Sequence, residues 1–409
     1  MSTELPVENH EEQTPAAVTP EEKPPRRKKR VYFYSFDALR VICITMLTFS
    51  SFGLPMPILE FIRPYLNSAT GILFTLYGFL VLRDGADLKK NIKHSVKVFA
   101  ILFAVYGLMT AGYLWLIYGK PFMYITKRGI FNFVVLNYWG DAFCSTIWYV
   151  QSTVYALIIC WIFKGLKKYD WIICILLFAL AAMIGELAGV INFSFLGNEY
   201  IPGNFLTRTI PYMLLGRIIN RSYRKLKKGG STLGKWLVIG GLIISVGEHF
   251  LLTMYDMLGY SNHLIGFILI SAGACLLAVR HPKGVKKRKL AKYAKRMYKG
   301  MYYVFNPLGY IFLLAATLLC RTQEQFFYCR VYAGLAVAVI NFAVFYCYSK
   351  AVHRMHVKKA IALRRQKRLE KELGEEGLNE EELIEEELIE EELNEEELSE
   401  EEGADKNEA

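Results

Sequence analysis

The sequence predicts an all-α polytopic membrane protein, a bundle of about ten transmembrane helices with both termini in the cytoplasm. Hydrophobic residues make up 53% of the 409 residues, and the mean hydropathy is +0.23. Uncharged apolar runs recur along the chain at the length that a bilayer requires. Lys and Arg cluster between these runs, which is typical of cytoplasmic loops. The pattern excludes a soluble enzyme and disfavours nucleic acid as a partner.

A transmembrane helix needs roughly twenty apolar residues, and ten segments approach that length. The sixth is short and contains Pro211, so it departs most from a regular span. The predicted spans cover residues 38–60, 66–82, 97–118, 145–163, 170–190, 205–220, 235–252, 262–280, 299–319 and 328–349.

The distribution of basic residues predicts the orientation of these spans. The N-terminal tail, the even-numbered connections with the span ends that adjoin them, and the C-terminal tail together hold 41 of the 49 Lys and Arg residues. Basic residues are concentrated on the cytoplasmic side of membrane proteins. We therefore expect a multi-pass protein of the cell (plasma) membrane with cytoplasmic N- and C-termini.

Composition divides the chain into four segments. Residues 1–30 are polar and end in PPRRKKR, which predicts a disordered cytoplasmic tail whose basic end meets anionic membrane lipids. Residues 31–350 form the ten-span membrane domain, and residues 351–369 form a basic cytoplasmic segment. Residues 370–409 repeat an acidic pentapeptide and hold 21 acidic residues against two lysines, which leaves +30 on the rest. This tail is either solvated or bound to a basic surface.

Ionisable residues inside a membrane segment are costly and indicate function by default. Arg40 lies at the cytoplasmic end of the first span, where it either serves a site or extends to lipid headgroups. Glu186, Arg208, Glu248 and His249 are all expected in the outer half of the bilayer, with Glu186 and Arg208 paired. The outer group is either an acceptor-binding site or a structural salt-bridge network.

Other chemistries find no support in the sequence. No Cys/His cluster has metal-ligand spacing, so we expect no metal. No glycine-rich phosphate loop or nucleophile elbow is present, and no tightly bound cofactor is expected. Cys320 and Cys329 flank one short outer connection, where the two thiols can meet.

Five strings occur in an order and at positions that resemble the membrane acyltransferase-3 family. The resemblance extends over about residues 31–350 and includes the number of spans. The strings are FDALR (36–40), GILFTLYGFLVLRD (71–84), IWYVQSTVYALI (147–158), IPYMLLGRII (210–219) and MYYVFNPLGYIFLL (301–314).

The resemblance implies an integral-membrane O-acyltransferase. Such a protein takes an acyl group, usually acetyl, from acyl-CoA and passes it to a hydroxyl of a cell-envelope polysaccharide or glycolipid. Asp37 and Arg40 match the family pattern, and Arg40 would hold a CoA phosphate. We expect the substrate-binding residues to be Trp148, Glu186, Arg208, Glu248 and His249.

Two positions depart from the family pattern. Ser51 and Asn306 occupy the catalytic positions where the family has histidines, and neither side chain can act as a base near neutral pH. Three interpretations follow. The chain is an acyltransferase in which another group is the base, with Glu248 and His249 as candidates; or it is a non-catalytic membrane scaffold or subunit; or it is a polysaccharide polymerase or a transporter of lipid-linked sugar.

Overall fold

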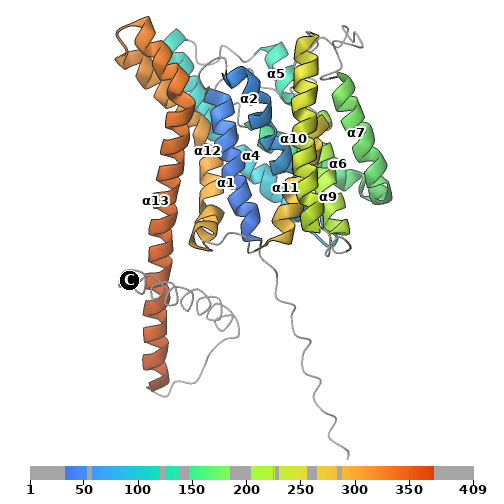
Figure 1. The fold of residues 1–409 in the computed structure, drawn as a ribbon. Helices are drawn as coiled ribbons and strands as arrows, with labels where there is room; N and C mark the ends of the chain where they lie inside the picture. The colour runs from blue at the N-terminus through green and yellow to red at the C-terminus, as the bar shows by residue number, and fades with distance from the viewer. Residues whose placement is uncertain are drawn as a thin grey trace, which may run out of the picture. The chain divides into compact units, whose positions relative to one another are not determined.

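All regular secondary structure that the computed structural model describes is helical (Figure 1). The described residues are 33–52, 58–119, 126–135, 137, 147–184, 204–223, 225, 230–255, 265–282 and 288–372. The predicted tail 1–30 and residues 373–409 of the acidic tail lie outside them. The helices are α1 (Tyr34–Phe52), α2 (Ile58–Asn67), α3 (Ala69–Val81), α4 (Leu88–Tyr118), α5 (Lys127–Val134), α6 (Ile147–Ile162), η2 (Lys164–Tyr169), α7 (Asp170–Ile184), η4 (Phe205–Thr209), α9 (Ile210–Ser222), α10 (Gly230–Met254), α11 (Ile265–Arg280), α12 (Arg288–Leu319) and α13 (Gln323–Glu372).

The helices have the apolar character that a membrane protein requires. By length and composition, four of the described helices can cross a bilayer, namely α4, α10, α12 and α13, and α6 and α11 are shorter apolar helices. Large apolar side chains such as Trp236, Ile243 and Leu318 are exposed on them. Apolar surfaces of this extent are unfavourable in water, whereas the lipid chains of a bilayer can cover them. The chain is therefore an all-α membrane protein.

A helix occupies the centre of each predicted span, but several boundaries differ. Helix α4 begins nine residues before the predicted span at 97, and α12 begins eleven residues before the one at 299. Helix α13 continues beyond residue 349 to Glu372, so the basic segment 351–369 belongs to the same helix. Pro211 lies in the first turn of α9, where its missing N–H does not disturb the helix, and a π-helical turn, η4, precedes it.

Helices α3 and α9 form the buried centre of the described helices. Most of α3 and all of Ile210–Ile219 in α9 are shielded from solvent. Two glycines allow the backbones to touch: a Cβ on Gly78 would lie 2.6 Å from the Met213 Cα, and one on Gly216 would lie 2.6 Å from the Phe79 nitrogen. No side chain fits at either position. The distance between α3 and α9 is therefore set by glycine.

The other helices pack around this centre in pairs. Helix α10 lies against α11, where a Cβ on Gly241 would meet the Gly266 carbonyl oxygen at 2.7 Å. Helix α1 contacts both α12 and α13. Asn341 and Ser349 of α13 donate hydrogen bonds to backbone carbonyls of α12, at 3.2 and 3.1 Å. Such bonds between helices satisfy polar groups that lipid cannot.

An ionic network connects α9 to the start of α7 and to the α3–α4 loop. Asp170, at the first turn of α7, accepts hydrogen bonds from Arg217 and, at 2.8 Å, from Arg221. Arg221 also donates to Asp84 at 3.2 and 3.3 Å, and this bond holds the pKa of the exposed Asp84 carboxyl below its usual range. The Arg217–Asp170 pair is buried, so each charge compensates the other.

We predict that Gly216→Ala lowers the thermal stability of the full-length protein in detergent. The added methyl group would overlap α3 backbone atoms that cannot move independently, and overpacking of this kind costs about 1–3 kcal/mol or more. The measurement is the unfolding temperature of the purified variant. Gly240→Ala is the matched control, because nothing lies within 4 Å of a Cβ there. Equal unfolding temperatures for Gly216→Ala and the wild type would refute the glycine contact.

Candidate functional site

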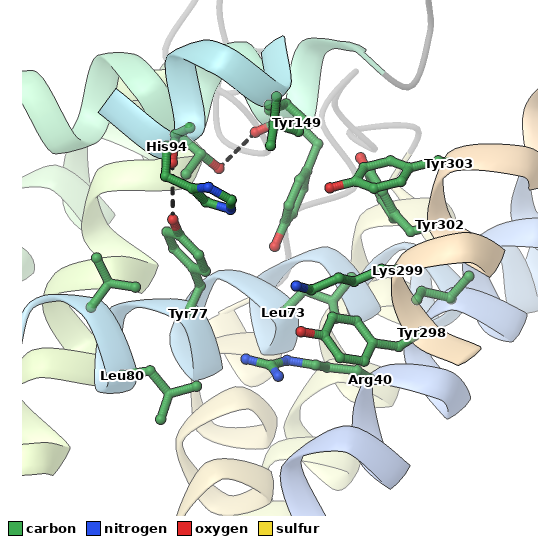
Figure 2. Close-up of a pocket in the computed structure, with 16 residues that line it drawn as sticks. Arg40, Leu73, Tyr77, Leu80, His94, Tyr149, Tyr298, Lys299, Tyr302 and Tyr303 are labelled. Atoms are coloured by element: carbon green, nitrogen blue, oxygen red, sulfur yellow. Dashed lines mark hydrogen bonds between the residues drawn. The ribbon is translucent and has the colours of Figure 1, made fainter. Parts of the chain in front are cut away.

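A cavity of about 330 Å³ lies between α1, α3, α4, α6 and α12 (Figure 2). Its volume falls at the lower end of the range for small-molecule sites. Aliphatic side chains form part of its wall. The other lining residues are polar or aromatic: Arg40, Tyr77, His94, Ser95, Tyr149, Thr153, Tyr298, Lys299, Tyr302 and Tyr303.

Arg40 is held inside the protein. Its Nη1 donates a hydrogen bond of 2.8 Å to Asp37, one helical turn earlier, and its guanidinium lies 4.7 Å from the ring centre of Tyr298 on α12. The Arg40 side chain is 12% exposed and Asp37 is 2% exposed. The i, i+3 spacing and the cation–π contact fix the guanidinium at the cavity wall. Arg40 thus lines a cavity of the described helices.

The tyrosines supply hydroxyl groups and ring faces to the cavity. Tyr77 shares a hydrogen bond of 3.1 Å with Ser95, which joins α3 to α4. Tyr149 stacks on Phe74 with 4.2 Å between ring centres and also packs against Tyr302 at 5.0 Å. Figure 2 shows the rings of Tyr77, Tyr149, Tyr298 and Tyr303 arranged around one space. A ligand there can both hydrogen-bond and stack.

The charge of the cavity favours an anion. Arg40 and Lys299 are cationic, His94 can become so, and none of the sixteen lining residues is an aspartate or a glutamate. Asp37 lies behind Arg40 and is bound to it. Phosphate and carboxylate groups form stronger hydrogen bonds with a guanidinium than neutral acceptors do.

The other predicted catalytic residues are not in the cavity. Ser51 is exposed near the end of α1, eleven residues beyond Arg40, or about 16 Å along the helix. Its neighbour Ser50 is the buried one, and it donates to the side-chain oxygen of Asn67. Asn306 is buried on α12 but does not line the cavity.

Arg208 and Trp148 contact each other away from the cavity lining. The Arg208 guanidinium, on η4, lies 5.5 Å from the Trp148 ring centre and donates to the Asn67 carbonyl at 3.2 Å. Among the described residues no carboxylate pairs with Arg208, and its Nε has no hydrogen-bond partner. The expected pairing with Glu186 lies outside the described residues.

Glu248 and His249 have different surroundings. Glu248 accepts hydrogen bonds from the backbone amides of Ile265 and Gly266, at 3.1 and 3.0 Å, in the first turn of α11. These amides have no partner within their own helix, so the carboxylate acts as a cap. His249 is buried with its ring 6.1 Å from that of Tyr65, in the last turns of α2. Neither residue lines the cavity.

Sequence reasoning missed His94, Lys299 and the cavity tyrosines. It placed His94 and Lys299 at or before the start of a span because both spans were drawn too short. One signal was present: Asp87 is a typical N-cap, and its carboxylate accepts from the Lys90 amide at 3.1 Å. That cap, with apolar residues at Leu88 and Ile92, marks the earlier start of α4.

The chain matches no family model, no curated protein and no solved structure. Within the described residues no group of three or more His, Cys, Asp or Glu side chains is placed to hold a metal. The motifs and the cavity are therefore the features of the chain that bear on its function.

We predict that Glu248→Ala lowers the unfolding temperature of the detergent-purified protein. Loss of a side-chain acceptor at a helix N-terminus costs about 0.5–2 kcal/mol, and here two amides lose their partner. Glu324→Ala, at an exposed position in the first turn of α13, is the control. An unchanged unfolding temperature in Glu248→Ala would contradict the capping role.

Proposed function

We propose that the chain is an integral-membrane acyltransferase that moves an acyl group, with acetyl as the favoured one, from acyl-CoA to a hydroxyl of a cell-envelope polysaccharide or glycolipid. The observation that carries the proposal is the position of Arg40. This residue ends the FDALR string, and the same residue lines the cavity beside Lys299, His94 and the tyrosines. Arg40 therefore belongs both to the motif and to the cavity wall.

The cavity has dimensions and charge that suit the reactive end of acyl-CoA. At about 330 Å³ it accommodates an acyl group with part of the pantetheine arm, and it leaves the nucleotide at the mouth. Lys90, Lys93 and Lys97 are exposed on the first turns of α4, where phosphates of that nucleotide would lie. Aromatic and aliphatic side chains on the cavity wall would limit the water that reaches the thioester.

We further propose ten spans with cytoplasmic termini in the plasma membrane. Arg40 and His94 each lie six residues after the start of their helix, and Lys299 lies eleven residues after. At 1.5 Å per residue these positions are roughly 9 and 16 Å from the helix starts. The basic connections precede all three helices, so the cationic end of the cavity would face the cytoplasm, where acyl-CoA is present.

The proposed topology places the α12–α13 turn outside the cell, and it predicts a disulfide there. The Sγ atoms of Cys320 and Cys329 lie 3.6 Å apart. We expect differential alkylation and mass spectrometry of isolated membranes to show these two cysteines protected until reduction, because disulfides persist on the oxidising side. Cys347, a single exposed thiol on α13, is the control. Free thiols that a membrane-impermeant maleimide labels only after permeabilisation would refute the topology.

Acetyl-CoA binding tests the donor site. We predict saturable binding of acetyl-CoA to the purified full-length protein, measured by calorimetry in detergent, and at least about tenfold weaker binding for Arg40→Ala. A hydrogen bond to a charged group contributes roughly 1.5–3 kcal/mol, which corresponds to that factor. Arg330→Ala, exposed on α13, is the control. A folded wild-type protein that does not bind acetyl-CoA would refute the proposal.

A second candidate is a non-catalytic subunit that binds acyl-CoA or an acceptor for a partner enzyme. The observation in its favour is the identity of Ser51 and Asn306, neither of which is a base. This candidate predicts acetyl-CoA binding with no release of free CoA, whereas the acyltransferase releases CoA at every turnover.

A further inference from the structure

The cavity contains an imidazole that no motif identifies. His94 lies in the second turn of α4 and lines the cavity with Arg40. Figure 2 shows its ring between the side chains of Tyr77 and Tyr149. Of the sixteen lining residues, His94 is the one that ordinarily exchanges a proton near neutral pH.

Two contacts hold α4, which carries the solvent-exposed His94, against other helices that line the cavity. The next residue, Ser95, is buried and shares its hydrogen bond with Tyr77 of α3. Farther along α4, the hydroxyl of Tyr106 donates to the backbone carbonyl of Tyr303 on α12. These bonds join α4 to the helices that carry the opposite walls of the cavity.

We propose that His94 is the general base of the acyl transfer. This inference rests on the proposed function. The Nε2 or Nδ1 lone pair of His94 accepts the proton of the acceptor hydroxyl as its oxygen bonds to the thioester carbonyl carbon. The C–S bond then breaks, and the CoA thiolate leaves and takes the proton from the imidazolium, which restores neutral His94. Base assistance of this kind accelerates proton transfer about 10²–10⁴-fold.

The charged and titratable groups around His94 are consistent with this role. Those lining the same space are Arg40 of α1, Tyr77 of α3, Tyr149 of α6, and Tyr298, Lys299, Tyr302 and Tyr303 of α12. The cations stabilise the negative charge that develops on the carbonyl oxygen, and the tyrosine hydroxyls can donate to that oxygen. Ser51 and Asn306 offer no such surroundings, because neither lines the cavity.

The test is the release of free CoA thiol from acetyl-CoA by the full-length protein in octyl glucoside, whose sugar hydroxyls serve as the acceptor probe. We expect His94→Gln to lower kcat at least 100-fold while the Kd for acetyl-CoA stays within twofold. Wild-type kcat should fall at acidic pH, since an imidazolium accepts no proton, and this acidic limb should be absent in the variant. His281→Gln, which changes an exposed histidine outside the cavity, should keep wild-type kcat.

Each other outcome has a separate meaning. If His94→Gln keeps kcat within threefold, or if it loses acetyl-CoA binding together with kcat, His94 is not the base. A wild-type protein that binds acetyl-CoA but releases no thiol overturns the role of His94 and supports the non-catalytic subunit. A folded wild-type protein that neither binds nor turns over acetyl-CoA overturns the proposed function itself.

Discussion

The contact between α3 and α9 at Gly78 and Gly216 is the constraint on which the described core depends. Because glycine has no Cβ at either position, the two backbones can approach until they touch, and most of α3 is buried. Tyr77 precedes Gly78, so it projects from α3 in another direction, into the cavity. The close helix pair therefore also fixes one wall of the candidate site. A change in the α3–α9 distance would move Tyr77 and, through Ser95, the start of α4.

Three arginines of the described helices show how differently the fold compensates a cation. Arg217 pairs with Asp170, an arrangement that satisfies both charges and connects two helices. Arg208 has a tryptophan ring and a single carbonyl, with no carboxylate among the described residues. Arg40 combines an aspartate with a tyrosine ring and still borders a cavity. A cation in a membrane segment is energetically costly, and one that borders a cavity is by default a candidate for a functional site.

The sequence could predict an all-α membrane fold and the approximate centres of the helices, because long apolar runs report on burial in lipid. It also identified Arg40, whose charge stands out in an apolar run. It could not place Glu248, since a carboxylate that caps another helix depends on packing between α10 and α11 rather than on local pattern. It missed His94 and Lys299 for a related reason. A hydropathy window ends where polar residues begin, although the helix continues and still carries side chains into the cavity.

The position of a base follows from the cavity and not from a fixed place in the chain. A proton acceptor must reach the hydroxyl that attacks the thioester, and any helix that lines the donor site can supply it. Along α1, Ser51 lies about 16 Å beyond Arg40, so a donor group held by Arg40 would not reach it within the cavity. Helix α4 instead carries His94 to the same space as Arg40. Serine at position 51 is therefore compatible with catalysis when another helix provides an imidazole.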